Sequence, residues 1–378
     1  MQEPFFTRYH QETSCRARTG RMALPHGTVN CPAFMPVGTN GTVKALTRED
    51  LREIGFEIIL ANTYHLYLRP GSEVLAAAGS LHAFMGWPGN ILTDSGGYQV
   101  FSLAPFRKIR EEAVQFRSHI DGSSHILSPE KVVDLQALFN SDIQMQLDLC
   151  TPWGTPYKKA QESLRITSLW LQKAKQAWDA QVQAGYQGKL FAIVQGNFFK
   201  DLRAQSLSAV LDAETPGIAI GGLSVGEPEA AFLEYLAYTA EGLPEDKPRY
   251  VMGIGTPRYI LSAIEQGIDI FDCVLPTRSG RIGHVFTRKG PLVLKKSENR
   301  LDFSPIDEAC GCKVCQTYSR AYLRHLFKTQ EILCAMLASY HNLYFLHELV
   351  RNARKAIEED RFLAFKRAFL ACYDGDTQ

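Results

Sequence analysis

This 378-residue chain lacks a strong net charge, a long apolar run and an even set of cysteines. Its 41 lysines and arginines nearly cancel its 40 aspartates and glutamates, so the chain as a whole is neither acidic nor basic. No window approaches the roughly 20 apolar residues of a membrane span, and the first residues, MQEPFFTRYHQETS, lack the basic region and apolar stretch of a secretory leader. We therefore expect a cytoplasmic protein with no membrane contact.

The cysteines point to metal rather than to disulfides. There are nine of them, an odd number, and three lie within six positions. The chain is 45% hydrophobic, enough for a large core and for one big domain with an appendage.

What the chain does have is a regular alternation of short apolar runs and segments with helical spacing. Eight runs end in Gly, Asp, Thr or Gln or close to one of them, at residues 34–39, 57–63, 90–97, 142–148, 190–196, 217–224, 250–256 and 268–274. Near-continuous apolar strands separated by helices predict a parallel sheet covered on both faces, and eight units predict a closed (β/α)8 barrel, the TIM-barrel form of the α/β class. An open doubly wound sheet is the alternative.

Two stretches interrupt the alternation. QFRSHIDGSSHIL, inside residues 101–127, predicts a hairpin inserted after the third strand, with Asp121-Gly122 in its turn. VFTRKGPLVL predicts a second hairpin after the eighth strand, followed by a cysteine cluster and a helical segment over about 343–373. We therefore divide the chain into a catalytic barrel, residues 1–275, and a zinc-binding subdomain with a C-terminal helical segment packed on the barrel, residues 276–378.

Polar residues follow several of the predicted strands. In such a barrel the chemistry lies at the carboxyl ends of the strands, where the sequence places Asp94, Asp148, Gln195 and Asp272. A single aspartate after a strand usually caps the next helix or turn, but three acids at one mouth are costly unless a substrate uses them. Two carboxylates suit glycosidic chemistry, and a carboxylate beside an amide suits the edge of a purine-like base, on which Tyr98 could stack.

CGCKVC supplies Cys310, Cys312 and Cys315, and His341 follows in SYHNLYF. Three thiolates and an imidazole make the closed tetrahedral set of one structural zinc. Two other histidines, His325 and His347, and a fourth cysteine, Cys334, compete for the fourth ligand position. A redox C-x-x-C pair would need a thioredoxin-like βαβ context, which is absent from the sequence.

Several of these stretches together resemble the bacterial-type tRNA-guanine transglycosylases. The matching segments, in one order along the chain, are TDSGGYQVFSL (93–103), SDIQMQLDLCTPW (141–153), FAIVQG (191–196), GGLSVGEP (221–228), YVMGIGTP (250–257), FDCVLPTRSGR (271–281) and the Cys3His set. The resemblance implies exchange of guanine at the wobble position of a tRNA anticodon for a 7-deazaguanine, either 7-aminomethyl-7-deazaguanine or queuine, in queuosine modification. It also implies a homodimer.

The resemblance assigns roles by position. Asp272 would be the nucleophile that forms an ester with the ribose, in a retaining double displacement, and Asp94 the group that accepts and donates protons. The implied base-binding residues are Asp94, Ser95, Gly96, Gly97, Tyr98, Asp148, Cys150, Gln195, Gly222, Leu223, Val225, Met252 and Gly253.

Charge supports an RNA partner. Residues 273–328 hold eleven basic and four acidic side chains, an excess of seven in a chain whose net charge is +1. Such an excess suits a surface that binds phosphates. A single lysine would not carry this inference, because isolated charged side chains are common on protein surfaces. The resemblance places RNA contacts at Gly253, Ile254, Gly255, Thr256, Pro257, Arg258 and Tyr259, and at Thr277, Arg278, Ser279, Gly280 and Arg281.

One position departs from the family pattern. Where bacterial members typically read Asp-Glu-Cys, this chain reads Asp148-Leu149-Cys150. If the missing acid favours an aminomethyl cation, Leu149 leaves room for queuine as the incoming base, whereas Cys150 and Val225 fit the smaller base.

Two other functions stay open: a nucleosidase or glycosidase that hydrolyses the base, and a non-catalytic zinc protein that binds RNA.

Overall fold

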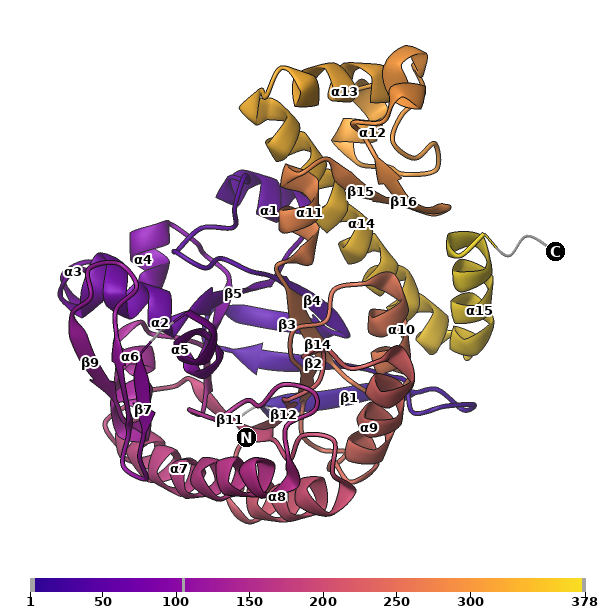
Figure 1. The fold of residues 1–378 in the computed structure, drawn as a ribbon. Coiled ribbons are helices and arrows are strands. Elements are labelled where there is room, and N and C mark those ends of the chain that lie inside the picture. Colours follow the sequence, from indigo (N-terminus) through magenta and orange to yellow (C-terminus); the bar gives the residue numbers. More distant parts are fainter. Residues whose placement is uncertain (1–3, 104–105, 376–378) are drawn as a thin grey trace.

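The computed structural model describes residues 4–103 and 106–375, and its centre is a barrel of eight parallel strands (Figure 1). The strand order around it is β4-β14-β13-β12-β11-β10-β6-β5, and the bridge between Val37 and Leu60 joins the first strand to the last. The prediction of a closed barrel is confirmed. The strands are β4 (Ala33–Pro36), β5 (Ile58–Asn62), β6 (Asn90–Asp94), β10 (Ile143–Met145), β11 (Lys189–Val194), β12 (Gly217–Ile220), β13 (Arg249–Val251) and β14 (Ile270–Cys273).

Helices surround this barrel, and its strands are therefore buried on both faces. Alternate residues such as Leu60, Leu92 and Ile193 fill the interior, while their neighbours Ile59 and Ile91 pack outward against the helices. The helices and the π-helix η1 are α1 (Arg48–Ile54), α2 (Thr63–Leu66), η1 (Tyr67–Gly71), α3 (Ser72–Ala77), α4 (Leu81–Met85), α5 (Gly97–Leu103), α6 (Pro129–Leu138), α7 (Tyr157–Gln183), α8 (Lys200–Asp212), α9 (Glu229–Glu241), α10 (Pro257–Glu265) and α11 (Leu275–Arg281).

Both predicted hairpins are present. The insertion after β6 is a three-stranded antiparallel sheet of β7 (Arg107–Ile109), β8 (Val114–Arg117) and β9 (Ser124–Leu127), one strand more than the sequence predicts. The second hairpin consists of β15 (His284–Thr287) and β16 (Gly290–Val293).

A further antiparallel sheet precedes the barrel and is missing from the sequence prediction. It consists of β1 (Phe6–Gln11), β2 (Arg18–Leu24) and β3 (Gly27–Cys31). Met22 and Val29 of this sheet pack with the interior residues of the barrel. Asn90, the first residue of β6, donates to the carbonyl oxygen of Gly27 at 3.3 Å. The sheet therefore closes the amino-terminal end of the barrel, opposite the ends where the predicted site lies.

The C-terminal region continues through η2 (Ser297–Leu301), α12 (Lys313–Thr317), α13 (Arg320–Lys328), α14 (Ile332–Glu358) and α15 (Phe362–Tyr373). The long helix α14 extends from the region of the cysteine cluster down the side of the barrel, where it contacts α1 and α10 (Figure 1). Because α1 follows β4 and α10 follows β13, α14 takes the place of the eighth barrel helix. The helical segment thus begins at Ile332, earlier than predicted, and it divides into two helices.

Across the described parts of the chain, no helix combines the length and the apolar character that crossing a membrane requires.

Candidate active site and metal centre

A cavity of about 330 Å³ opens at the carboxyl ends of the barrel strands. It is lined by every residue predicted to act on or bind the base, from Asp94 in β6 to Asp272 in β14. Because parallel strands all end at the same mouth, segments far apart in the sequence meet there. The structure therefore brings the predicted base site together in one place.

Asp272 lies near the end of β14, with donors on one of its oxygens. Oδ1 accepts hydrogen bonds from the Tyr250 hydroxyl at 2.5 Å and from the Gly253 amide at 2.9 Å. Burial raises the pKa of the Asp272 carboxyl, while both hydrogen bonds favour the ionised form. No hydrogen bond to Oδ2 from another residue is present among the described residues, and Asp272 lines the cavity.

Asp94 lies at the end of β6 and is held by four donors. Oδ1 accepts from the Thr63 amide at 3.0 Å and the Gly96 amide at 3.2 Å, and Oδ2 accepts from Gln99 at 2.9 Å and from the Asn62 side chain. Burial raises the pKa of this carboxyl to about 7, against the effect of those donors, and the charge of Asp272 raises it further. A carboxyl with this pKa can accept and donate a proton near neutral pH.

Asp148 and Gln195 form a buried polar pair in the same cavity. The Gln195 amide donates to Asp148 Oδ2 at 2.6 Å, and the Ser95 hydroxyl donates to Oδ1 at 3.3 Å. Burial raises the Asp148 pKa to about 6. The pair offers both acceptors and donors to the edge of a bound ring.

Apolar and sulfur-containing side chains complete the walls. Tyr98, 56% exposed, lies at the rim on α5, and Met252 lies just after β13. Cys150 and Val225 line the same cavity. Burial, followed by the charge of Asp148, raises the pKa of the Cys150 thiol to about 12, so this cysteine is a neutral wall residue.

Leu149 does not line this cavity. It packs into the main hydrophobic core and borders a small separate hollow with Trp170 and Arg107. Side chains alternate between opposite sides of an extended segment, and Asp148 and Cys150 take the cavity side. The interpretation of Leu149 as a pocket residue that bears on the incoming base therefore has no support in the structure.

Sequence reasoning missed the residues that hold the carboxyl groups. Asn62 and Gln99 donate to Asp94, and Tyr250 donates to Asp272. Gln99 and Tyr250 lie inside the motif stretches that carry the resemblance, so their proximity to the acids was a usable signal. Asn62 ends the preceding strand, a position that only the strand register brings beside Asp94.

The two predicted RNA-contact segments border the mouth, but few of their side chains are free. Arg278 lines the cavity and is exposed, as is Arg281. Thr277 and Gly280 are buried under α14. Arg258 forms ion pairs with Asp374 at the end of α15 and, at 3.7 Å, with Glu229.

The four predicted metal ligands meet in the C-terminal region. Cys310, Cys312, Cys315 and His341 are all buried, and their ligand atoms lie within 4.8 Å of one another. His341 Nδ1 is 3.8, 3.4 and 3.4 Å from the sulfurs of Cys310, Cys312 and Cys315. Tetrahedral zinc with ordinary bond lengths separates sulfur and nitrogen by about 3.6 Å. His341 Nε2 contacts the Phe286 carbonyl oxygen at 2.7 Å, which leaves Nδ1 for the metal.

The competing ligands lie elsewhere. His325 is exposed on α13, His347 packs edge-on against Phe56, and the Cys334 sulfur contacts the Leu323 carbonyl. His325 is separated from the cysteines by a break in the helical chain near Tyr318, between α12 and α13.

A second group that could hold a metal consists of His26, His82 and Asp142, at the amino-terminal end of the barrel. Asp142 accepts hydrogen bonds from both imidazoles, at 2.7 and 3.1 Å, and the rings are stacked with centroids 3.7 Å apart. These contacts account for the group as hydrogen bonds that fasten the closing sheet, without a metal.

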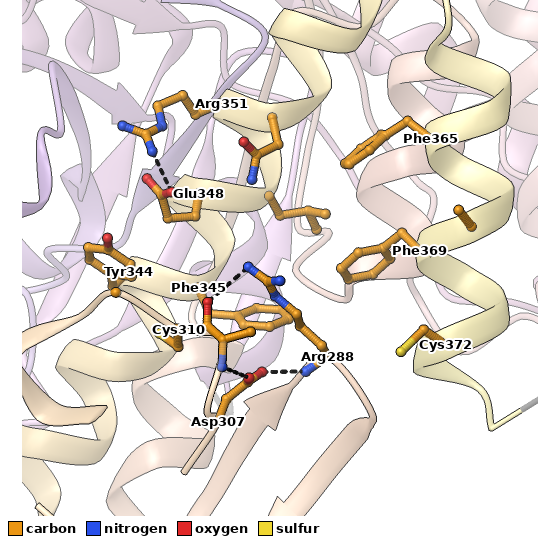
Figure 2. Close-up of a pocket in the computed structure, with 15 residues that line it drawn as sticks. Arg288, Asp307, Cys310, Tyr344, Phe345, Glu348, Arg351, Phe365, Phe369 and Cys372 are labelled. Carbon is orange, nitrogen blue, oxygen red and sulfur yellow. Dashed lines mark hydrogen bonds and ion pairs between the residues drawn. The ribbon is translucent and has the colours of Figure 1, made fainter. Parts of the chain in front are cut away.

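A second cavity, of about 590 Å³ and so larger than the one at the barrel mouth, lies away from that mouth. Figure 2 shows it between the β15–β16 side of the C-terminal region and helices α14 and α15, with Phe345, Phe369 and Cys372 on its walls. Asp307 holds one end by accepting from the amides of Arg288 and Ala309. This larger cavity contains none of the predicted base-binding residues, so the size of a cavity alone does not identify the base-binding site.

Fold and site together define the class: a (β/α)8 enzyme with carboxylates suited to glycosyl transfer at its mouth, beside an appended region whose Cys3His group could hold a metal ion. Residues 13–375 match the family described as "Queuine tRNA-ribosyltransferase", and the chain belongs to that family. Curated relatives with that name include those of Treponema denticola (58% identity over 98% of this chain and 97% of the relative) and Caldanaerobacter subterraneus (51%, 97% and 97%). The relative of Borrelia hermsii is 52% identical over 96% of both chains.

Proposed function

We propose that this chain exchanges guanine at the wobble position of a tRNA anticodon for a 7-deazaguanine by two displacements at the same ribose carbon. As a member of its family the chain is a tRNA-guanine transglycosylase, a pentosyltransferase of queuosine modification. The observation that carries the mechanism is the meeting of Asp272 and Asp94 with the Asp148–Gln195 pair in one cavity.

In the first displacement, Asp272 Oδ2 attacks the anomeric carbon. The bond from that carbon to guanine breaks as the ester forms, and protonated Asp94 gives its proton to the departing base. A pKa of about 7 supplies that proton at neutral pH. Tyr250 and Gly253 support the ionised form of the nucleophile.

In the second displacement, the now ionised Asp94 removes a proton from the incoming base. The base attacks the same carbon from the face that guanine left, and the Asp272 carboxylate is released. Two inversions give net retention. One glycosidic bond replaces another, so the exchange needs neither ATP nor a redox cofactor.

Base recognition would use the cavity walls. Asp148 accepts from the N–H groups of the guanine edge, and Gln195 with the Gly222 and Leu223 backbone binds the adjacent carbonyl. Tyr98 and Met252 would cover the two faces of the ring. Ser95, Gly96 and Gly97 shape the wall beside Asp94, where a Cβ on Gly97 would lie 2.6 Å from the Asp148 carbonyl.

The tRNA would approach over the segments 253–259 and 277–281, with the wobble base turned out of its loop into the cavity. Arg278 and Arg281 are the exposed cations of these segments, and the basic surplus of residues 273–328 extends the positive surface. The tRNA substrate would place the protein in the cytoplasm.

Of the two incoming bases, we favour 7-aminomethyl-7-deazaguanine over queuine. Cys150 and Val225 line the cavity and leave less room for a bulky substituent. Leu149, packed in the core, does not enter this choice.

We infer that the buried Cys3His group holds one structural zinc, which when bound would tie α14 to the loop that carries the cysteines.

We also propose a homodimer that forms through the zinc-binding subdomain. Leu301, Phe303 and Ile332, the three most exposed large apolar residues of the described chain at 71–77%, all belong to it. Light scattering should give twice the 42.3 kDa chain mass for the wild type and a single chain for Phe303→Asp. A monomeric wild type would refute the dimer.

The experiment that tests the reaction combines the protein, substrate tRNA and labelled guanine. We expect incorporation into tRNA and an RNA adduct on a denaturing gel, both lost in Asp272→Ala and retained in Asp121→Asn, an exposed control in the insertion. Release of base without incorporation would identify a hydrolase instead. Incorporation that survives Asp272→Ala would exclude this residue as the nucleophile.

A further inference from the structure

Arg203 is a buried cation directly behind the base cavity. It belongs to α8, and only 1% of its surface is exposed. Nε donates to the Asn197 carbonyl at 2.8 Å, and Nη1 lies 3.5 Å from the Thr239 hydroxyl. In the portion of the chain described, no carboxylate forms an ion pair with it. A guanidinium buried among neutral oxygens is unfavourable, and burial lowers its pKa to about 10.

The remaining hydrogen bonds of Arg203 go to one short stretch of backbone. Nη2 donates to the Gly221 carbonyl at 3.1 Å and to the Gly222 carbonyl at 3.4 Å. In a trans peptide the carbonyl and the following N–H point in opposite directions. Holding these two carbonyls therefore directs the N–H groups of Gly222 and Leu223 away from Arg203.

The side away from Arg203 is the cavity. Gly221, Gly222 and Leu223 line it, whereas Arg203 does not. Over the residues that the structure covers, no oxygen accepts a hydrogen bond from the N–H of Gly222 or Leu223, and the Gly222 amide points toward the thiol of Cys150, another residue of the cavity wall. Gly222 has φ +67°, and a Cβ there would lie 2.5 Å from Gln195 Oε1, so the conformation needs glycine. Two amide donors thus face the place where a base would bind, one of them held only by the weak acceptor Cys150.

We propose that Arg203 is a positioning residue for base recognition, which fixes the peptide planes of 221–223 so that two amide donors face the carbonyl oxygen of the bound base. It touches the substrate only through this backbone. Its positive charge behind the donors also favours the negative charge that the base gains as its bond to ribose breaks. This inference rests on the proposed function of the cavity.

The test measures equilibrium binding of free guanine and of 2-aminopurine, in the absence of tRNA. The two purines differ at C6, where 2-aminopurine lacks the carbonyl, and at N1, which carries a proton only in guanine. Asp148, the proposed partner of that N–H, is the same in wild type and variant, so a change of preference on substituting Arg203 reports the carbonyl contact. We expect the wild type to prefer guanine and Arg203→Gln to lose that preference by about tenfold or more, since donors out of place no longer meet the carbonyl. The affinity for 2-aminopurine should change little.

Arg18→Gln is the matched control. Arg18 is equally buried but lies at the other end of the barrel, paired with Asp269. Its loss should lower stability and leave the guanine preference of the folded protein unchanged. Arg203→Lys, which keeps the charge but has no fork to hold both carbonyls, should show a smaller loss and decides the question if Arg203→Gln does not fold.

A folded Arg203 variant with the wild-type preference for guanine would overturn the role of Arg203. A wild type that binds neither purine would instead overturn the proposed base cavity. Failure of exchange alone would count against the proposed reaction and leave the binding result standing.

Discussion

At the scale of single residues, burial raises the pKa of all three carboxyl groups in the cavity, Asp94 to about 7 and Asp148 to about 6. Their surroundings differ. Asp94 has four donors, and Asp272 has two on a single oxygen. Three aspartates in different surroundings can thus serve as proton carrier, base-binding group and nucleophile. In other enzymes, too, the surroundings of a carboxyl group determine whether it acts as acid or base.

The two half-reactions should respond oppositely to pH. Adduct formation needs protonated Asp94, so its single-turnover rate should fall as pH rises through about 7. Entry of the new base into a preformed adduct needs ionised Asp94, so that rate should rise over the same range. Asn62→Ala removes a donor that favours the ionised form and should move both midpoints to higher pH. Rates independent of pH between 6 and 8 would exclude Asp94 as the proton carrier.

Leu149→Glu should leave base preference unchanged. The side chain lies in the core beside Trp170 and outside the cavity, so an acid there does not reach the substituent of the base. The measurement is kcat/KM for guanine, 7-aminomethyl-7-deazaguanine and queuine, with Val225→Gly, a change in the cavity wall, as the comparison variant. A shift of preference in Leu149→Glu would mean that the segment 148–150 rearranges.

The sequence located the cavity residues because strand ends and motif stretches identify them without coordinates. It misplaced Leu149 because adjacency to Asp148 and Cys150 was read as proximity to the base. Alternation along an extended segment would have predicted the opposite direction. Arg203 carried no signal, because a single arginine in a helix gives no indication of which carbonyls it meets.

At the scale of elements, α14 joins the metal centre to the catalytic mouth. It carries His341, and its next residue, Asn342, donates to the Pro276 carbonyl in α11 at 2.9 Å. A Cβ on Gly280 of α11 would lie 2.7 Å from the Ser339 amide, so the two helices are in close backbone contact. A metal held by the Cys3His group would therefore help to fix the helix on which Arg278 and Arg281 lie.

Cys312→Ala should lose about one equivalent of zinc by metal analysis, and its melting temperature should fall. Structural zinc in small domains contributes on the order of 10 kcal/mol to folding. Affinity for tRNA should fall more than affinity for free guanine, because α11 is displaced while the cavity floor is held by the barrel. Cys334→Ala, which changes a buried cysteine of α14 that lies outside the cluster, is the control. Full metal content in Cys312→Ala would contradict the ligand assignment.

The elements that were not predicted from the sequence were missed for the same physical reason. β1 is largely exposed and β2 contains a glycine and two arginines, so neither reads as an apolar strand. The start of α14 was missed because its first turn, with Ile332 77% exposed, has no amphipathic pattern. Long-range packing, rather than local periodicity, stabilises these elements.

At the scale of the whole molecule, an almost neutral chain concentrates positive charge in the segment that begins at the end of β14. Segregation of this kind can steer an RNA toward one side without making the whole protein basic. The cations near the mouth are not equally available to RNA phosphates, because some of them already form ion pairs within the protein.

Arg278→Ala and Arg281→Ala should each weaken tRNA binding and reduce the slope of log affinity against log salt by about 0.7, the value for a contact to single-stranded phosphate. Arg258→Ala should have little effect on that slope, since Asp374 and Glu229 already neutralise Arg258. Filter binding over a salt series measures all three. An equal reduction in Arg258→Ala would show that its ion pairs open on binding RNA.

Because α14 is at once the eighth wall of the barrel and the carrier of a metal ligand, the two regions cannot be exchanged as separate modules. A chain cut after residue 275 would leave a gap between α1 and α10 and expose the apolar residues of both, so neither piece should be a usable building block in a fusion protein. By the same reasoning, genetic recombination that replaced the metal-binding region alone would have to preserve the barrel-facing side of one helix, residue by residue.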